Sequence, residues 1–87
     1  MPPTAPGGLT AKLGKGRKVA LSWAASTDNV GVIGYQLYRN GKLVATVTGT
    51  FYTDALGTKT RIATYDVVAF DAADNVSAAS NAVTVSL

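Results

Sequence analysis

Residues 37–45 read Leu-Tyr-Arg-Asn-Gly-Lys-Leu-Val-Ala, and this stretch decides the fold. A two-residue hairpin turn of type I′ needs a positive φ at both central positions, which Asn and Gly tolerate well. Asn40 and Gly41 stand between two short runs that contain apolar residues, so the stretch predicts a β-hairpin with these two residues at its tip. The fold is therefore expected to be built from antiparallel strands.

Apolar residues alternate with small or polar ones on both sides of this hairpin. Val19, Leu21 and Trp23 show the pattern clearly, and a period of two is typical of a strand with one buried face. The same period predicts inward-facing side chains at Ile33, Tyr35, Leu37, Ala63, Tyr65, Val67, Ala69, Val83 and Val85.

Seven short strands follow from these patterns and from the turn residues between them. They are an edge strand near Leu9 and strands at 19–23, 33–39, 43–48, 51–54, 61–70 and 82–87. The expected fold class is all-β, a seven-stranded antiparallel β-sandwich. Residues 1–6, rich in Pro, are expected to form a linker, and residues 7–87 a single domain.

Composition excludes several kinds of chemistry. The chain has no His, Cys or Glu, so it can build no disulfide, thiolate nucleophile, imidazole base or zinc centre. Its five Asp are expected in turns or on outward strand faces, whereas a glycosidic acid catalyst needs an apolar pocket. We therefore expect no enzyme activity and no cofactor.

No apolar run reaches the roughly 18 residues of a membrane-spanning helix, and we expect no membrane partner. Residues 1–3 are followed by neither a charged segment nor an apolar one, so no signal peptide is expected. Targeting information is expected to lie outside this chain.

Several segments resemble a bacterial fibronectin type III domain. They are residues 21–23, 27–32, 34–41, 65–77 and 80–83, in the family's order and spacing. The resemblance is to modules of secreted enzymes that degrade polysaccharides or other polymers, such as chitinases, cellulases and polyester depolymerases. It implies an immunoglobulin-like topology and an extracellular accessory module.

The chain departs from this family at two positions. The family has a Tyr near the start of its sixth strand that ties the preceding turn, but this chain has Ala63 there. We expect Thr58 or Thr60 to tie the turn instead. Asp74 stands where relatives commonly have Gly, and Asp tolerates left-handed geometry better than most residues, so the turn is expected to persist.

Polar residues of two loops are expected to meet at one end of the sandwich. Calcium takes six to eight oxygen ligands, and these loops supply carboxylates and carbonyls. The other interpretation is that the side chains cap their own turns, and we favour it. The residues are Asp28, Asn29, Asp71, Asp74 and Asn75.

All eight cations are expected at the opposite end, in or beside the turns after the first, third and fifth strands. We call this set the basic pole: Lys12, Lys15, Arg17, Lys18, Arg39, Lys42, Lys59 and Arg61. Two interpretations of the basic pole are open. The cations are either solvated turn residues, which we favour, or they contact an acidic polymer or an acidic neighbouring domain. No aromatic platform is interleaved with these cations, so nucleic acid is not an expected partner.

Two aromatic residues, Tyr38 and Phe70, fall on the outward face of their strands, as do Ile62 and Val68. If the strands pair as in the family, these four residues form a semi-apolar strip. Such a strip stacks on sugar rings or packs against a neighbouring domain, and both interpretations stay open.

The resemblance implies a secreted or cell-surface, non-catalytic accessory module, expected to be a monomer. We expect it to act as a spacer between the catalytic and substrate-binding domains of a bacterial carbohydrate-active enzyme, with neighbouring domains of the same chain as partners. The alternatives are a weak polysaccharide- or polymer-binding module and a protein-docking module of a cell-surface protein.

Overall fold

The computed structural model describes residues 3–27, 31–57 and 59–86, which form a sandwich of two antiparallel sheets. A three-stranded sheet has the order β1-β2-β5, and a four-stranded sheet has the order β4-β3-β6-β7. The strands are β1 (Gly7–Leu13), β2 (Lys18–Ala24), β3 (Val32–Arg39), β4 (Lys42–Val47), β5 (Phe51–Ala55), β6 (Ile62–Asp71) and β7 (Val83–Ser86). The predicted all-β class with seven strands is confirmed.

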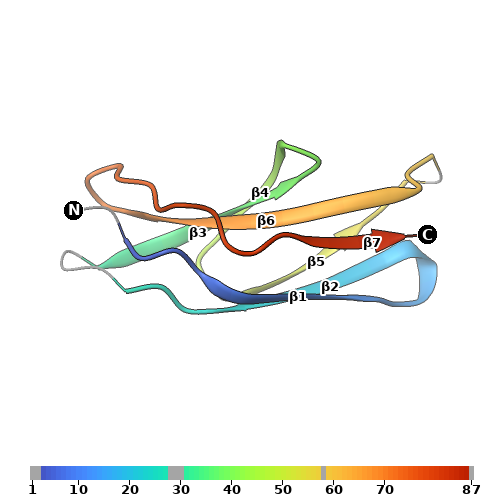
Figure 1. Ribbon diagram of the computed structural model, residues 1–87, viewed down its shortest axis with the longest axis horizontal. Helices are drawn as coiled ribbons and strands as arrows, with labels where there is room; N and C mark the ends of the chain where they lie inside the picture. Colours follow the sequence, from blue (N-terminus) through green and yellow to red (C-terminus); the bar gives the residue numbers. More distant parts are fainter. Residues whose placement is uncertain (1–2, 28–30, 58, 87) are drawn as a thin grey trace.

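The molecule is elongated along its strands, with principal extents of 41, 19 and 18 Å. Figure 1 shows that the chain enters at one end of the long axis and that β7 ends at the other. Within the described ranges the only helical segment is a 3-10 turn at Lys15–Arg17, and no helix there is long and apolar enough to cross a membrane.

The core lies between the two sheets and follows the predicted period of two. Val19, Leu21 and Trp23 are buried on β2. On β6 every second residue from Ala63 to Ala69 has no exposed surface, and on β7 Val83 and Val85 pack against this core while half-buried. The inward faces of these strands were therefore predicted correctly.

The hairpin between β3 and β4 has the predicted geometry. Asn40 has φ 52° and Gly41 has φ 81°, the pair of positive angles that a type I′ turn requires. The Asn40 side chain also binds β6, because its Oδ1 accepts from the Thr64 backbone N–H at 2.9 Å. This hydrogen bond holds the hairpin beside the start of β6.

One predicted core residue is on the surface. Ile33 is 51% exposed, although its place in the alternation predicts an inward side chain. Val32 pairs with Asp71 and Gly34 with Phe70, so two steps along β3 match one step along β6. Ile33 is the extra residue of this β-bulge, and a bulge changes the face toward which a side chain points.

The segment before β1 makes contacts with the sandwich. Pro3 and Pro6 are buried, and the Thr4 backbone N–H donates to the carbonyl oxygen of Thr27 at 2.9 Å. The division into a linker at residues 1–6 and a domain at 7–87 stays a prediction.

Candidate functional surfaces

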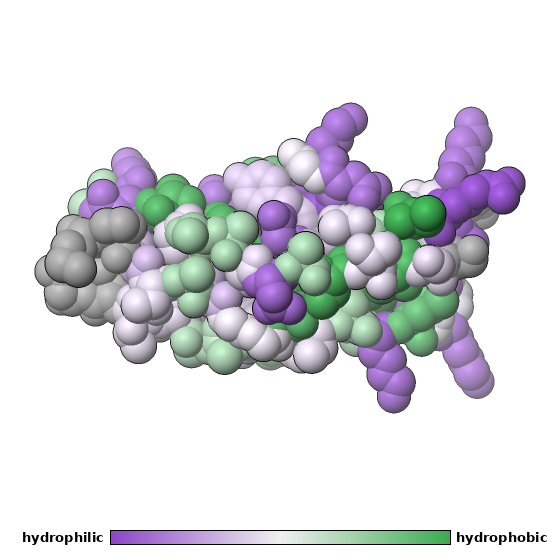
Figure 2. Space-filling model, in the orientation of Figure 1, coloured by the Kyte–Doolittle hydropathy of each residue, from purple (hydrophilic) through white to green (hydrophobic). Residues whose placement is uncertain are grey.

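The residues of the predicted basic pole lie in or beside three turns, and the β1–β2 turn lies at the end of the molecule where β7 finishes (Figure 1). Lys12, Lys15, Arg17 and Lys18 lie in or beside the β1–β2 turn, Arg39 and Lys42 flank the hairpin tip, and Lys59 and Arg61 precede β6. Arg17 and Arg39 are half-buried and the other six are exposed. Figure 2 shows long hydrophilic side chains projecting from this end of the molecule.

Arg17 holds the turn that precedes β6. Its Nε donates to the carbonyl oxygen of Gly57 at 3.1 Å, and its Nη2 donates to the carbonyl oxygen of Thr60. Arg17, on the neighbouring turn, therefore ties this segment through two backbone carbonyls, a contact that was not predicted. The expected tie through Thr60 stays a prediction, and Thr58 lies outside the described residues. A guanidinium reaches two carbonyls at once because its donors are arranged as a fork.

A buried carboxylate joins the two sheets beside the basic pole. Asp54 on β5 is 6% exposed; its Oδ2 lies 2.5 Å from Arg39 Nη1 and accepts from the Tyr65 hydroxyl at 2.8 Å. The expectation that every Asp lies in a turn or on an outward face is wrong for Asp54. Side chains alternate between the two faces of β5, and Asp54 lies on the inward face. No local pattern indicates this cluster, because Tyr65 and Arg39 lie 11 and 15 residues from Asp54 along the chain.

This cluster shifts the pKa of both partners of Asp54. Burial, and then the hydrogen bond to Asp54, raise the pKa of the Tyr65 hydroxyl well above its usual value. The hydrogen bond to Asp54 raises the pKa of the Arg39 guanidinium, which stays positively charged. The cluster thus joins the two sheets through the Tyr65 hydrogen bond and the Arg39 ion pair.

At the other end of the sandwich, Asp71 caps the turn after β6. This side chain has no exposed surface, and its Oδ1 accepts from the backbone N–H groups of Ala73 and Asn75, both at 2.9 Å. Asp74 has φ 64°, so the left-handed turn persists without Gly, as predicted. These bonds support turn capping over calcium binding.

The calcium hypothesis falls only partly within the described residues. Asp28 and Asn29 of the calcium hypothesis lie outside the described residues. Across residues 3–27, 31–57 and 59–86, no group of three or more carboxylate, His or Cys side chains is close enough to hold a metal ion.

The predicted semi-apolar strip is only partly brought together. Phe70 lies opposite Gly34, and a Cβ at Gly34 would lie 2.7 Å from the Phe70 ring, so this ring covers the glycine. Val68 is only 9% exposed and pairs with Gln36, while Tyr38 lies opposite Asp66.

Ile62 lies apart from the rest of this strip. It is 59% exposed and is separated from Val68 on the same face of β6 by Thr64 and Asp66. The outer face of this sheet therefore includes a carboxylate, and Phe70 serves the packing of its own sheet.

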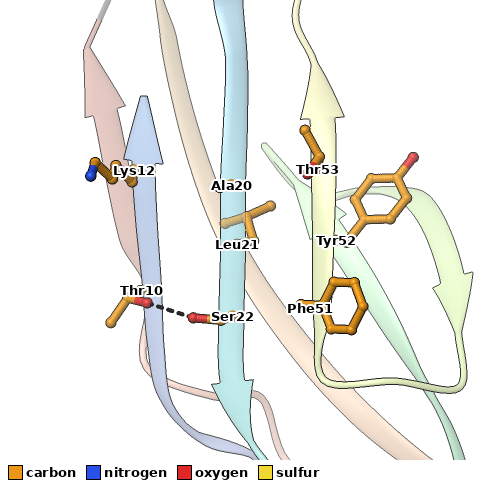
Figure 3. A pocket seen from close by; sticks show the side chains of 8 residues that line it. All are labelled: Thr10, Lys12, Ala20, Leu21, Ser22, Phe51, Tyr52 and Thr53. Carbon is orange, nitrogen blue, oxygen red and sulfur yellow. Dashed lines mark hydrogen bonds between the residues drawn. The ribbon is translucent and has the colours of Figure 1, made fainter. Parts of the chain in front are cut away.

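A shallow groove lies on the outer face of the other sheet, where sequence reasoning placed no site. It has a volume of about 350 Å³ and extends across β1, β2 and β5, as Figure 3 shows. Phe51 stands at its border and is 73% exposed. The alternation of side chains along β5 could have indicated that Phe51 is exposed. Tyr52 and Asp54 share the inward face, so Phe51 and Thr53 share the outward face.

Comparisons with known proteins place similar sequences inside large enzymes. No protein-family model matches the chain. It is 51% identical over 85 residues to Chitinase Chi52 of Paenibacillus xylanexedens, 52% over 84 residues to Chitinase A1 of Niallia circulans and 47% over 83 residues to Exoglucanase B of Cellulomonas fimi. These matches cover 97%, 95% and 95% of this chain but 16%, 12% and 8% of the relatives.

The fold is shared with solved structures. An Fn3-like protein from Clostridium thermocellum superposes with a TM-score of 0.81 and 28% identity, covering 97% of this chain and 92% of that one. The spore cortex lytic enzyme SleM of Clostridium perfringens superposes with a TM-score of 0.85 at 21% identity, over 100% of this chain and 29% of that one. The resemblance drawn from the sequence is confirmed.

Proposed function

We propose that this chain, a fibronectin type III domain of the kind found in bacterial chitinases and cellulases, is a non-catalytic spacer in a larger enzyme. It would separate a catalytic domain from a substrate-binding domain, and those domains of the same chain would be its partners. The parent enzyme would be extracellular, because insoluble polysaccharides such as chitin and cellulose are degraded outside the cell.

The observation that carries this proposal is the path of the chain through the sandwich. The chain enters at one end of a 41 Å long axis and β7 ends at the other. A domain with this path holds whatever precedes it and whatever follows it apart. A flexible linker of the same extent would not fix that separation, because its end-to-end distance fluctuates.

The contacts of two of the four described carboxylates, Asp54 and Asp71, support a non-catalytic role. Asp54 is held by Arg39 and Tyr65, and Asp71 is held by the turn that it caps. Retaining and inverting glycosidases need two carboxyl groups facing each other across a substrate. These two side chains are buried within the fold, where no substrate reaches them.

The proposal can be tested in Chitinase A1 of Niallia circulans, where this chain would replace the segment that it matches. We expect the hybrid to keep the wild-type rates on insoluble chitin and on a soluble chito-oligosaccharide. Direct fusion of the flanking parts should lower the rate severalfold on insoluble chitin only, since a soluble substrate needs no fixed separation. Equal losses on both substrates would contradict the spacer role.

A further inference from the structure

We propose that the outer face of the β1–β2–β5 sheet carries a binding site for a neutral polysaccharide chain, with Phe51 as its stacking platform. The site is the groove of Figure 3. This inference goes beyond the spacer role, because a spacer needs no ligand.

Phe51 is not explained by the packing of the fold. It is 73% exposed, the highest value among the large hydrophobic side chains of the described residues. A Cβ at Gly49 would lie 3.7 Å from its ring, so the absence of a side chain there leaves the ring open. Exposing an aromatic ring to water is unfavourable, and a ligand that covered the ring would recover this free energy.

The neighbours of Phe51 form a shallow hollow that contains both polar and apolar side chains. Register places Thr10, Ser22 and Phe51 on one row across the three strands, and Lys12, Ala20 and Thr53 on the next row. The central strand contributes only small side chains, which lowers the floor of the groove between the two outer strands. The groove therefore has an exposed aromatic residue on β5 and a hydroxyl-bearing side chain on each of its three strands.

This combination suits a pyranose ring. The face of a pyranose carries C–H groups, which are attracted to the negative π face of an aromatic ring. Its rim carries hydroxyls, which both donate and accept. The Thr10 and Ser22 hydroxyls lie 2.9 Å apart and are hydrogen-bonded to each other, and each keeps further capacity for a sugar hydroxyl.

The size and charge of the groove favour a neutral sugar chain over other occupants. Its volume of about 350 Å³ falls within the roughly 300–1,000 Å³ of small-ligand sites. Two rows on three strands span only about 10 Å by 7 Å, far less than the roughly 800 Å² per partner of a stable protein complex. Lys12 is the one charged residue among those that border this groove.

The test is an NMR titration of the 87-residue chain with cellohexaose and with chitohexaose, at low and high salt. We expect weak, salt-insensitive binding of at least one of them, with shifts of the Thr10, Ser22 and Thr53 amide signals. Phe51→Ala should weaken this binding roughly two- to tenfold, the value of one aromatic contact, and Phe51→Tyr should retain it.

Ile62→Ala is the matched control, because Ile62 is 59% exposed on the other sheet. The proposal is overturned if neither oligosaccharide shifts the groove signals, if the shifts map to Tyr38 and Phe70, or if Phe51→Ala and Ile62→Ala bind alike. It is also overturned if binding disappears at high salt, which would assign it to the basic pole. None of these outcomes affects the spacer role, which the chitinase hybrid tests separately.

Discussion

At the residue scale, the Asp54 cluster is a buried polar contact between the two sheets. One carboxylate oxygen receives both the Arg39 guanidinium and the Tyr65 hydroxyl, and the three residues come from β5, β3 and β6. The cluster therefore connects the two sheets where their ends meet the basic pole. Removing one member of such a buried group leaves the others without their partner.

We expect Asp54→Ala to lower the free energy of unfolding by about 2–3 kcal/mol, because Arg39 and Tyr65 lose their shared acceptor. This loss of stability is smaller than that expected for a fully buried ion pair, since the Arg39 side chain is 28% exposed. Asp54→Asn keeps an acceptor for Tyr65 and should lose less. Urea unfolding followed by the fluorescence of Trp23, the single Trp, measures both, and equal stability of Asp54→Ala and wild type would contradict the cluster's role.

Tyr65 makes the stability depend on pH at the alkaline end. Its pKa is raised in the folded state, whereas in the unfolded chain it is about 10. A raised folded-state pKa contributes stability below the unfolded value, and this stability is lost as the pH rises above it. The free energy of unfolding should therefore fall by about 1 kcal/mol between pH 9 and pH 11 through this group.

Tyr65→Phe isolates that contribution, because other tyrosines and the lysines also titrate above pH 9. We expect the fall in stability to be smaller in Tyr65→Phe than in wild type. Urea midpoints at pH 9 and pH 11 give the comparison, and parallel curves would rule out a raised pKa at Tyr65.

At the element scale, β3 and β6 fit together through one glycine. Gly34 is buried, and a Cβ there would lie 2.7 Å from the Phe70 ring and 3.0 Å from the carbonyl oxygen of Val47. The β-bulge at Ile33 places Gly34 directly opposite Phe70. The Phe70 ring thus occupies the space that a side chain at position 34 would need.

Gly34→Ala should destabilise the domain by about 1–3 kcal/mol, the usual cost of overpacking. In a Phe70→Ala background the same change should cost less, because the ring that it displaces is gone. Thermal or urea unfolding of the double-mutant cycle measures this coupling. Gly7→Ala is the control, since nothing lies within 4 Å of its added Cβ, and equal costs of Gly34→Ala in both backgrounds would refute the packing.

Elements were predictable where the signal was local, and not where it came from distant contacts. Asn40 and Gly41 specify their hairpin through their own backbone preferences. The Ile33 bulge arises from pairing with β6, and the Arg17 tie joins residues 40 and more positions apart. The exposure of Phe51 was not predicted, although the alternation of side chains along β5 carries that signal, and its groove depends on two other strands.

At the scale of the whole molecule, the elongated shape of the domain is the basis of the proposed spacer role. Its long axis of 41 Å exceeds both other extents more than twofold, and the β1–β2 turn lies at one end of this axis while the turn after β6 lies at the other. The spacer function rests on this shape, whereas the proposed sugar site rests on the side chains of one face. The two therefore respond to different changes.

The most direct measurement replaces the matched segment of Chitinase A1 with an unrelated β-sandwich of the same length whose termini lie at opposite ends. If separation is the function, the ratio of the rates on insoluble chitin and on soluble chito-oligosaccharide should equal that of the hybrid carrying this domain. A Gly/Ser linker, which holds no fixed distance, should give a lower ratio. If the unrelated sandwich gives the low ratio of the direct fusion, spacing is not what this domain supplies.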